Sequence, residues 1–193
     1  MKIWTIQPIQ IWDLLRDQKV LYVDRGLCQE CDLFPEAFSW MCQQMGKRVL
    51  NYQGHLPWWG WQHPKPDLRF YSRKGINGTQ HIRIELEIPE DRVLLSLEHA
   101  WIALLNHIFV CYTDVEGVEW DVALEQNGID DRHRPLPEPW QSQLVASWER
   151  IFDLPGLFAG EAWPDTVQAT FEELRLSDVI QVTPFTIKSS MGV

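Results

Sequence analysis

Polar side chains on two short predicted strands are the first candidates for a reactive or ligand-binding site. Thr5 and Gln7 alternate with apolar residues near the start of the chain, and Gln168 and Glu172 do so near its end. Alternation puts the members of each pair on one side of their strand. We expect the two strands to lie side by side, with both polar rows facing a shared hollow. The sequence contains no phosphate-binding loop, dinucleotide glycine fingerprint or nucleophile elbow.

Other groups that carry out acid–base or metal chemistry are sparse. Cys28 and Cys31 form one Cys-x-x-Cys pair, but no second pair follows at zinc-ribbon spacing. We therefore favour reduced thiols, partly in the core, over structural zinc or a redox pair. Glu85 and Glu87 share one side of a strand. Paired carboxylates can act as acid and base, although an exposed polar sheet face is the commoner arrangement. The histidines lack ligand spacing, and no metal site is predicted.

The chain is rich in tryptophan, with eleven residues, and residues 57–69 combine three of them with three prolines. This segment is too interrupted for a long regular element and too aromatic for a free loop. We expect a lid that packs on the core. The alternative is a wall, formed by Trp59 and Trp61, against which a planar ligand ring stacks.

The element that must organise the fold runs through residues 79–106. Four apolar residues alternate with polar ones over residues 81–88, which indicates a strand with one buried face. Pro89 interrupts it, residues 93–95 resume as a strand, and an apolar stripe from Ala100 to Ile108 predicts a helix, for which Ser96 is a candidate cap.

The remaining elements also mix strands and helices. We predict strands at 3–7, 20–23, 166–171 and 178–185, with helices ending near Lys19, over 35–45 with Gly46 at the end, and over 140–152. Residues 25–32, 117–139 and 172–177 are expected as loops or connections, and 68–71 as a strand that forms a hairpin with the central strand. This order predicts an α+β fold, with a small split or mixed sheet and flanking helices, in a single domain over residues 1–193.

Charge and hydropathy exclude some classes of protein. Seventeen basic and 27 acidic residues give a net charge of −10, which disfavours nonspecific binding to nucleic acid. No apolar run is long enough to span a bilayer, and the first residues do not resemble a signal peptide, so we expect a cytoplasmic protein that does not bind membranes.

Four segments together resemble an uncharacterised bacterial family of unknown function. They are the opening Trp-Thr-Ile-Gln strand (4–7), the tryptophan-rich segment with Lys-Pro-Asp-Leu-Arg (58–69), the strand followed by Pro and Val-Leu-Leu-Ser (82–96), and the closing strands with Val-Gln-Ala-Thr-Phe (167–182). The resemblance covers nearly the whole chain and implies no activity.

The order of elements also resembles that of small ADP-ribosyltransferase-like domains. This resemblance implies a split sheet that binds NAD, and a macromolecule as the acceptor of the transferred group. This resemblance assigns catalytic roles to Thr5 on the first strand and Gln168 on the late strand, with Glu172 as a substitute carboxylate. It assigns cofactor binding to Gln7, Trp59, Trp61, Arg69 and Tyr71. A Gln can donate and accept hydrogen bonds but cannot carry negative charge. The resemblance therefore leaves open an NAD-dependent transferase or a catalytically degenerate relative.

Some residues of this set have simpler explanations. Gln168 can bond neighbouring backbone, and Arg69 can form a surface ion pair with Asp67. The alternative function is a non-enzymatic protein-interaction module, in which the tryptophan-rich segment 58–61 and the acidic stretch 114–131 form a partner surface.

Overall fold

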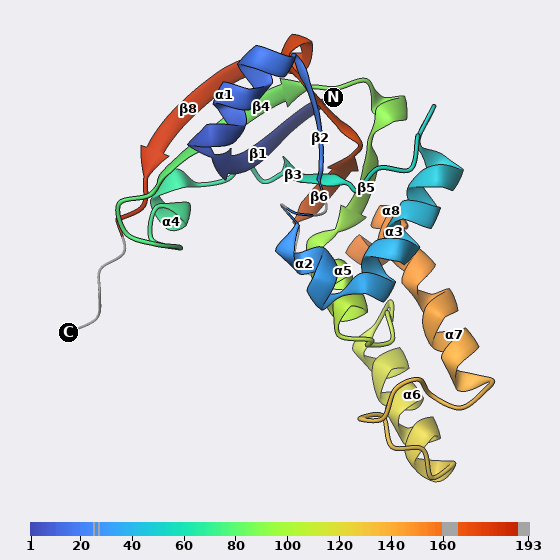
Figure 1. The fold of residues 1–193 in the computed structure, drawn as a ribbon. Coiled ribbons are helices and arrows are strands. Elements are labelled where there is room, and N and C mark those ends of the chain that lie inside the picture. Colours follow the sequence, from blue (N-terminus) through green and yellow to red (C-terminus); the bar gives the residue numbers. More distant parts are fainter. Residues whose placement is uncertain (25, 27, 160–165, 189–193) are drawn as a thin grey trace. The chain divides into compact units, whose positions relative to one another are not determined.

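The computed structural model describes residues 1–24, 26, 28–159 and 166–188 (Figure 1). The chain divides into two compact units. Unit 1 contains Met1–Leu95 and Val167–Val193, and unit 2 contains Ser96–Thr166. A single domain over residues 1–193 stays a prediction.

A six-stranded antiparallel sheet forms the centre of unit 1, and the α+β fold class is confirmed. The order of its strands is β5-β6-β3-β1-β4-β8 (Figure 1). Their bounds are β1 (Lys2–Pro8), β3 (Trp58–His63), β4 (Gln80–Glu87), β5 (Leu94–Leu97), β6 (Val167–Phe171) and β8 (Val179–Thr186). A second sheet pairs β2 (Val20–Tyr22) with β7 (Glu173–Arg175). Residues 173–175, expected as a connection, thus form a strand.

One face of the large sheet makes the core of unit 1. On β4 the predicted alternation is confirmed, because Ile82, Ile84 and Leu86 are fully buried. Leu21 and Leu174 of the small sheet join the same apolar cluster. Burying each side chain of this size stabilises a fold by about 1.5–3 kcal/mol.

Short helices flank these sheets. They are α1 (Ile9–Gln18), α2 (Gln29–Leu33), α3 (Pro35–Arg48), α4 (Leu68–Tyr71), and the short 3₁₀ helices η2 (Glu90–Arg92) and η4 (Leu176–Asp178). In α1 the apolar stripe buries Leu15 in the core. The prediction that Gly46 ends α3 was wrong, because the helix continues to Arg48 before Val49 turns to an extended conformation.

The tryptophan-rich segment is not a lid. Trp58 to His63 form β3, between β6 and β1, and the Trp58 indole donates to the Leu21 carbonyl at 3.1 Å. Long-range pairing on both sides overrides the local signal of the prolines, which stand outside the strand. The predicted hairpin strand at 68–71 is also wrong, since Asp67 caps α4 there by accepting a hydrogen bond from the Arg69 amide.

Among the described residues of unit 2, the regular elements are helices, apart from Ser96 and Leu97 at the end of β5. These helices are α5 (Glu98–Leu105), α6 (Asp114–Gln126), α7 (Trp140–Ser147), η3 (Trp148–Phe152) and α8 (Leu154–Ala159). The loop predicted over 117–139 was wrong for its first part. Thr113 caps α6 through Glu116, and the Trp120 ring stacks on Phe109, so capping and aromatic packing outweigh the acidic composition. Among the described residues, no helix has the length and apolarity needed to cross a membrane.

Candidate functional site

Two central strands of unit 1 diverge at the predicted site. Along β1 and β3, both described in full, ladder pairing is limited to Trp4 opposite Trp61. Beyond it the Thr5 hydroxyl donates to the Trp59 carbonyl at 2.7 Å, and the Gln7 amide donates to the Thr5 hydroxyl at 2.8 Å. Side chains thus replace backbone bonds where the strands part. Thr5 is fully buried and holds the strands together.

A cavity of about 480 Å³ adjoins the diverging strand ends, and we call it the tryptophan cavity. It is lined by Ile6, Gln7, Pro8, Ile11, Val23, Cys28, Glu30, Pro57, Trp58, Trp59 and Trp61. Its volume lies within the range of about 300–1,000 Å³ that is typical of small-molecule sites. Indole rings give it flat apolar walls. The Gln7 amide and the Glu30 carboxylate are polar groups placed among them.

The late strand does not lie beside the first one, contrary to the prediction. β3 stands between β6 and β1, and Gln168 lies opposite Trp61. Trp61 in turn lies opposite Trp4, so Gln168 is on the face of Trp4, whereas Thr5 pairs with the core residue Ile84 on the other face. The two polar rows therefore point to opposite faces of the sheet. Their sequences reveal the alternation but not the strand inserted between them.

Glu172 is buried but does not line the tryptophan cavity, and its contacts are with other residues. Its carboxylate accepts hydrogen bonds from the backbone amides of Gln53 and His55, each at 2.9 Å, and contacts His55 Nδ1 at 2.9 Å. The Tyr22 ring stacks on His55 at a centroid distance of 4.1 Å. These bonds tie the 51–55 segment to the sheet. His55 has no sequence signature that would have indicated this contact.

The other two predicted cofactor-binding residues sit outside the cavity lining. Arg69 is strongly exposed and forms an ion pair with Asp67 at 2.8 Å, the simpler of its two explanations. Its pKa is raised by the hydrogen bond to the Asp67 carboxylate. The Tyr71 ring packs on the Trp61 ring in a T-shaped arrangement, with a centroid distance of 5.4 Å, and so contacts a residue of the cavity wall.

The two carboxylates on β4 have different surroundings, and Glu85 is the one that is buried. Glu85 is buried and bonded to the Lys2 ammonium at 2.8 Å, to the Trp4 indole at 2.9 Å and to Lys65 at 3.4 Å. The hydrogen bond from Lys2, followed by that from Trp4, lowers the Glu85 pKa to about 2. Glu85 therefore stays ionised at neutral pH, which suits an ion-pair anchor rather than a general acid. The expectation of an exposed polar face was wrong for this residue.

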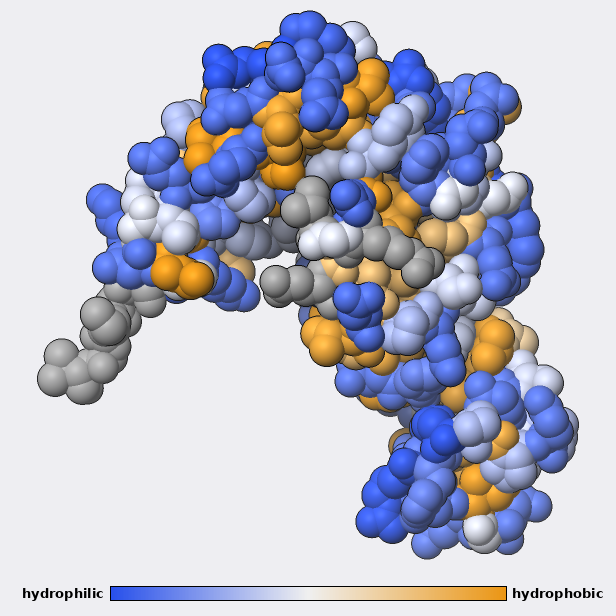
Figure 2. Space-filling view, viewed as in Figure 1, coloured by the Kyte–Doolittle hydropathy of each residue, from blue (hydrophilic) through white to orange (hydrophobic). Residues whose placement is uncertain are grey.

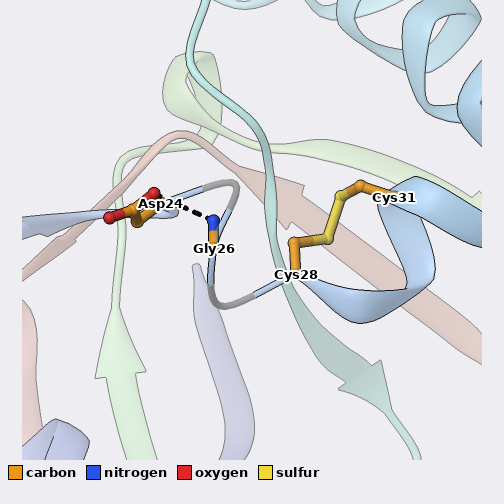
Figure 3. The surroundings of a disulfide bond; sticks show 4 residues. All are labelled: Asp24, Gly26, Cys28 and Cys31. Atoms are coloured by element: carbon orange, nitrogen blue, oxygen red, sulfur yellow. Dashed lines mark hydrogen bonds between the residues drawn. A yellow bond between two sulfur atoms is a disulfide. The ribbon is translucent and has the colours of Figure 1, made fainter.

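The Cys-x-x-Cys pair is oxidised, which corrects the prediction of reduced thiols. Cys28 and Cys31 form a disulfide with a Cα–Cα distance of 5.4 Å (Figure 3). Cys28 lines the tryptophan cavity. The spacing of the two cysteines was a signal for this contact, but only the fold brings Cys28 beside the tryptophans. Within the described residues, no group of three or more His, Cys, Asp or Glu side chains is arranged to hold a metal ion.

Comparisons with known proteins identify the family without an activity. No curated protein matches the chain, and no solved structure matches it. The ADP-ribosyltransferase-like resemblance accordingly stays a prediction. Residues 2–180 match the model of a family described as a domain of unknown function, DUF3841. The chain thus belongs to the DUF3841 family.

Proposed function

We propose that the tryptophan cavity binds NAD or a related nucleotide by stacking a planar base against its indole rings. The observation that supports this is the convergence of Gln7, Trp59 and Trp61 on one cavity of about 480 Å³. Stacking of a base on an aromatic side chain contributes about 1–3 kcal/mol in proteins that bind single-stranded nucleic acid. The Gln7 amide can exchange hydrogen bonds with a nicotinamide carboxamide or a purine edge.

Charge indicates which part of the ligand enters. Glu30 is exposed and lines the cavity, and its carboxylate repels phosphate. We therefore propose that the base and its ribose occupy the cavity while the pyrophosphate points to solvent. Nicotinamide mononucleotide and adenosine, compared as competitors, distinguish the two halves of NAD.

The proposed activity is binding rather than efficient transfer. The ADP-ribosyltransferase-like resemblance assigns the catalytic position on the late strand to Gln168. This side chain lacks a negative charge that could stabilise a cationic transition state. The candidate substitute, Glu172, has its carboxylate engaged by Gln53 and His55. We expect NAD hydrolysis at the rate of a buffer control.

Titration with NAD, followed by calorimetry and tryptophan fluorescence, tests this proposal. We expect saturable binding that weakens at least tenfold in Trp59→Ala and in Gln7→Leu, the latter of which keeps the volume of the side chain while removing its amide. Trp120→Ala, in unit 2, is the matched control and should bind as the wild type does. Absence of binding at millimolar NAD, or unchanged affinity in folded Gln7→Leu and Trp59→Ala proteins, contradicts the proposal.

A second candidate function, protein interaction, is favoured by the outer face of α6. Val115, Val118 and Val122 are 66%, 61% and 42% exposed and form one stripe along the helix. The inner face is apolar as well, since Leu124 is buried and Trp120 stacks on Phe109. Apolar residues at the surface near α6 lie beside strongly hydrophilic ones (Figure 2).

The charged residues of α6 support a basic partner. α6 contains no Lys or Arg, and its acidic residues are Asp114, Glu116, Glu119, Asp121 and Glu125. We propose that this face binds a basic amphipathic helix of another protein. A synthetic helix with a leucine stripe flanked by lysines should bind, and its glutamate-flanked counterpart should not. Equal binding to a Val118→Ser, Val122→Ser variant would show that charge alone attracts the peptide and would exclude the site.

A further inference from the structure

The Cys28–Cys31 disulfide has a position that a purely structural bridge does not require. It joins cysteines three residues apart, at the start of α2 (Figure 3). The Cys31 amide already donates to the Cys28 carbonyl at 3.2 Å. A disulfide stabilises a fold mainly by closing a loop in the unfolded chain, and the effect decreases as the loop shortens. A bridge across so short a loop is therefore poorly suited as a staple.

The two sulfur atoms have different surroundings. Cys28 is half-buried and lines the tryptophan cavity, in which Glu30 and Trp59 are neighbours. Cys31 is only 9% exposed and lines a separate cavity of about 260 Å³ together with Phe38 and Cys42. A small molecule that enters the tryptophan cavity thus meets Cys28 first.

We propose that the Cys28–Cys31 pair is a reversible thiol–disulfide exchange site, whose co-reactant is a small thiol admitted through the tryptophan cavity. The thiolate of this co-reactant attacks the Cys28 sulfur and forms a mixed disulfide there. The bond between the two cysteine sulfurs breaks, and its electron pair leaves on Cys31, which takes up a proton.

A second thiolate completes the exchange. It attacks the co-reactant sulfur of the mixed disulfide, so that Cys28 leaves as a thiolate and is protonated. The protein disulfide gains two electrons and two protons, and two thiols become one small-molecule disulfide. The reverse sequence reoxidises the pair. This assignment does not depend on nucleotide binding, because both steps involve only sulfur atoms.

Thiol counting on the native protein tests the exchange. The chain has four cysteines, of which Cys42 and Cys111 are not part of a disulfide, so alkylation after denaturation should label two thiols in the oxidised protein. Prior incubation of the folded protein with reduced glutathione should raise the count to four, and oxidised glutathione should return it to two. Four thiols in protein exposed to air, or a bridge that is reduced only when the protein unfolds, would overturn the proposal.

Trapping identifies the sulfur that is attacked. In Cys31→Ser, oxidised glutathione should form a mixed disulfide at Cys28, detected by intact mass and peptide mapping. In Cys28→Ser, the buried Cys31 should react at least tenfold more slowly. Cys42→Ser and Cys111→Ser are the controls and should retain the wild-type cycle. Equal trapping rates, or loss of the cycle in Cys42→Ser, would overturn the assignment of Cys28.

Discussion

Glu85 and Glu172 are buried carboxylates of unit 1 that are stabilised by different partners. Glu85 is held by two lysine ammonium groups and an indole N–H, whereas Glu172 accepts hydrogen bonds from two backbone amides and contacts a histidine ring. A buried carboxylate without such partners would be strongly unfavourable. We therefore predict different effects when each of these two side chains is substituted.

The stability contributed by Glu85 should depend on pH. Its folded-state pKa lies near 2, below the ordinary value of 4.5, so ionised Glu85 stabilises the fold above pH 4.5 and loses this effect as pH falls toward 2. At pH 7, Glu85→Gln should lower the free energy of unfolding by about 1 kcal/mol, because both lysines are half-exposed and water screens their charges. Urea unfolding of both proteins from pH 7 to pH 2 measures the difference. A difference that does not shrink on acidification contradicts the ion-pair role.

Removal of the Glu172 carboxylate should loosen one segment. Glu172→Ala leaves the Gln53 and His55 amides without their acceptor, so we expect a loss of about 1–2 kcal/mol in unfolding free energy. Native-state hydrogen exchange should accelerate at these two amides more than elsewhere in the sheet. Glu172→Gln keeps one acceptor oxygen and should retain most of the protection. Similar exchange rates of these amides in the alanine variant and the wild-type protein would show that Glu172 does not hold this segment.

At the scale of elements, the close approach of β1 and β3 depends on a residue without a side chain. A Cβ atom added at Gly60 would lie 2.7 Å from the Trp4 carbonyl oxygen and 2.8 Å from Ile3 Cγ2. Contacts this short with backbone force the strands apart. Gly60 thus allows β3 to approach β1 beside the tryptophan cavity.

Two glycine substitutions should have opposite effects. Gly60→Ala should destabilise the protein by about 1–3 kcal/mol, because β1 and β3 must separate. Gly46→Ala is the matched change in α3, where the nearest atom is 3.6 Å away, and should stabilise by about 0.5–1 kcal/mol. Thermal and urea unfolding measure both. If Gly60→Ala is neutral, the strands are less tightly apposed than the structure indicates.

At the scale of the whole molecule, unit 2 begins within β5 and ends just before β6, and these two strands are neighbours in the large sheet. The chain leaves unit 1 after Leu95 and returns to it at Val167. Because β5 and β6 belong to the same sheet, both ends of the inserted chain are held by that sheet. This connectivity favours joint unfolding of the two units.

We accordingly predict a single cooperative unfolding transition. In calorimetry the ratio of calorimetric to van't Hoff enthalpy should be close to one. Glu85→Gln in unit 1 and Glu116→Gln, which removes the charge from the 2.6 Å ion pair with Arg150 in unit 2, should each shift the entire transition. Two resolved transitions, each sensitive to one of these variants, would show that the units are separate domains.

The periodicity of apolar residues predicted most of the helices and strands, because this pattern is local and can be read directly from the sequence. The alternation on β4, the stripe of α1 and the closing strands β6 and β8 were predicted within a few residues. The errors fell where long-range contacts outweigh local propensity. β3 was not predicted because its segment is rich in proline and tryptophan, and α6 was not predicted because its segment is acidic.

The candidate site followed a similar division. Local sequence predicted Thr5 and Gln7 on one side of a short strand and offered Trp59 and Trp61 as a stacking wall, but it did not predict the strand that carries the two tryptophans. The fold brings these residues together where β1 and β3 diverge. Only the tertiary structure decided that β3 separates β6 from β1 and that Cys28 borders the same cavity. Strand order and the lining of a cavity depend on pairings between residues far apart in the chain, and no single segment contains that information.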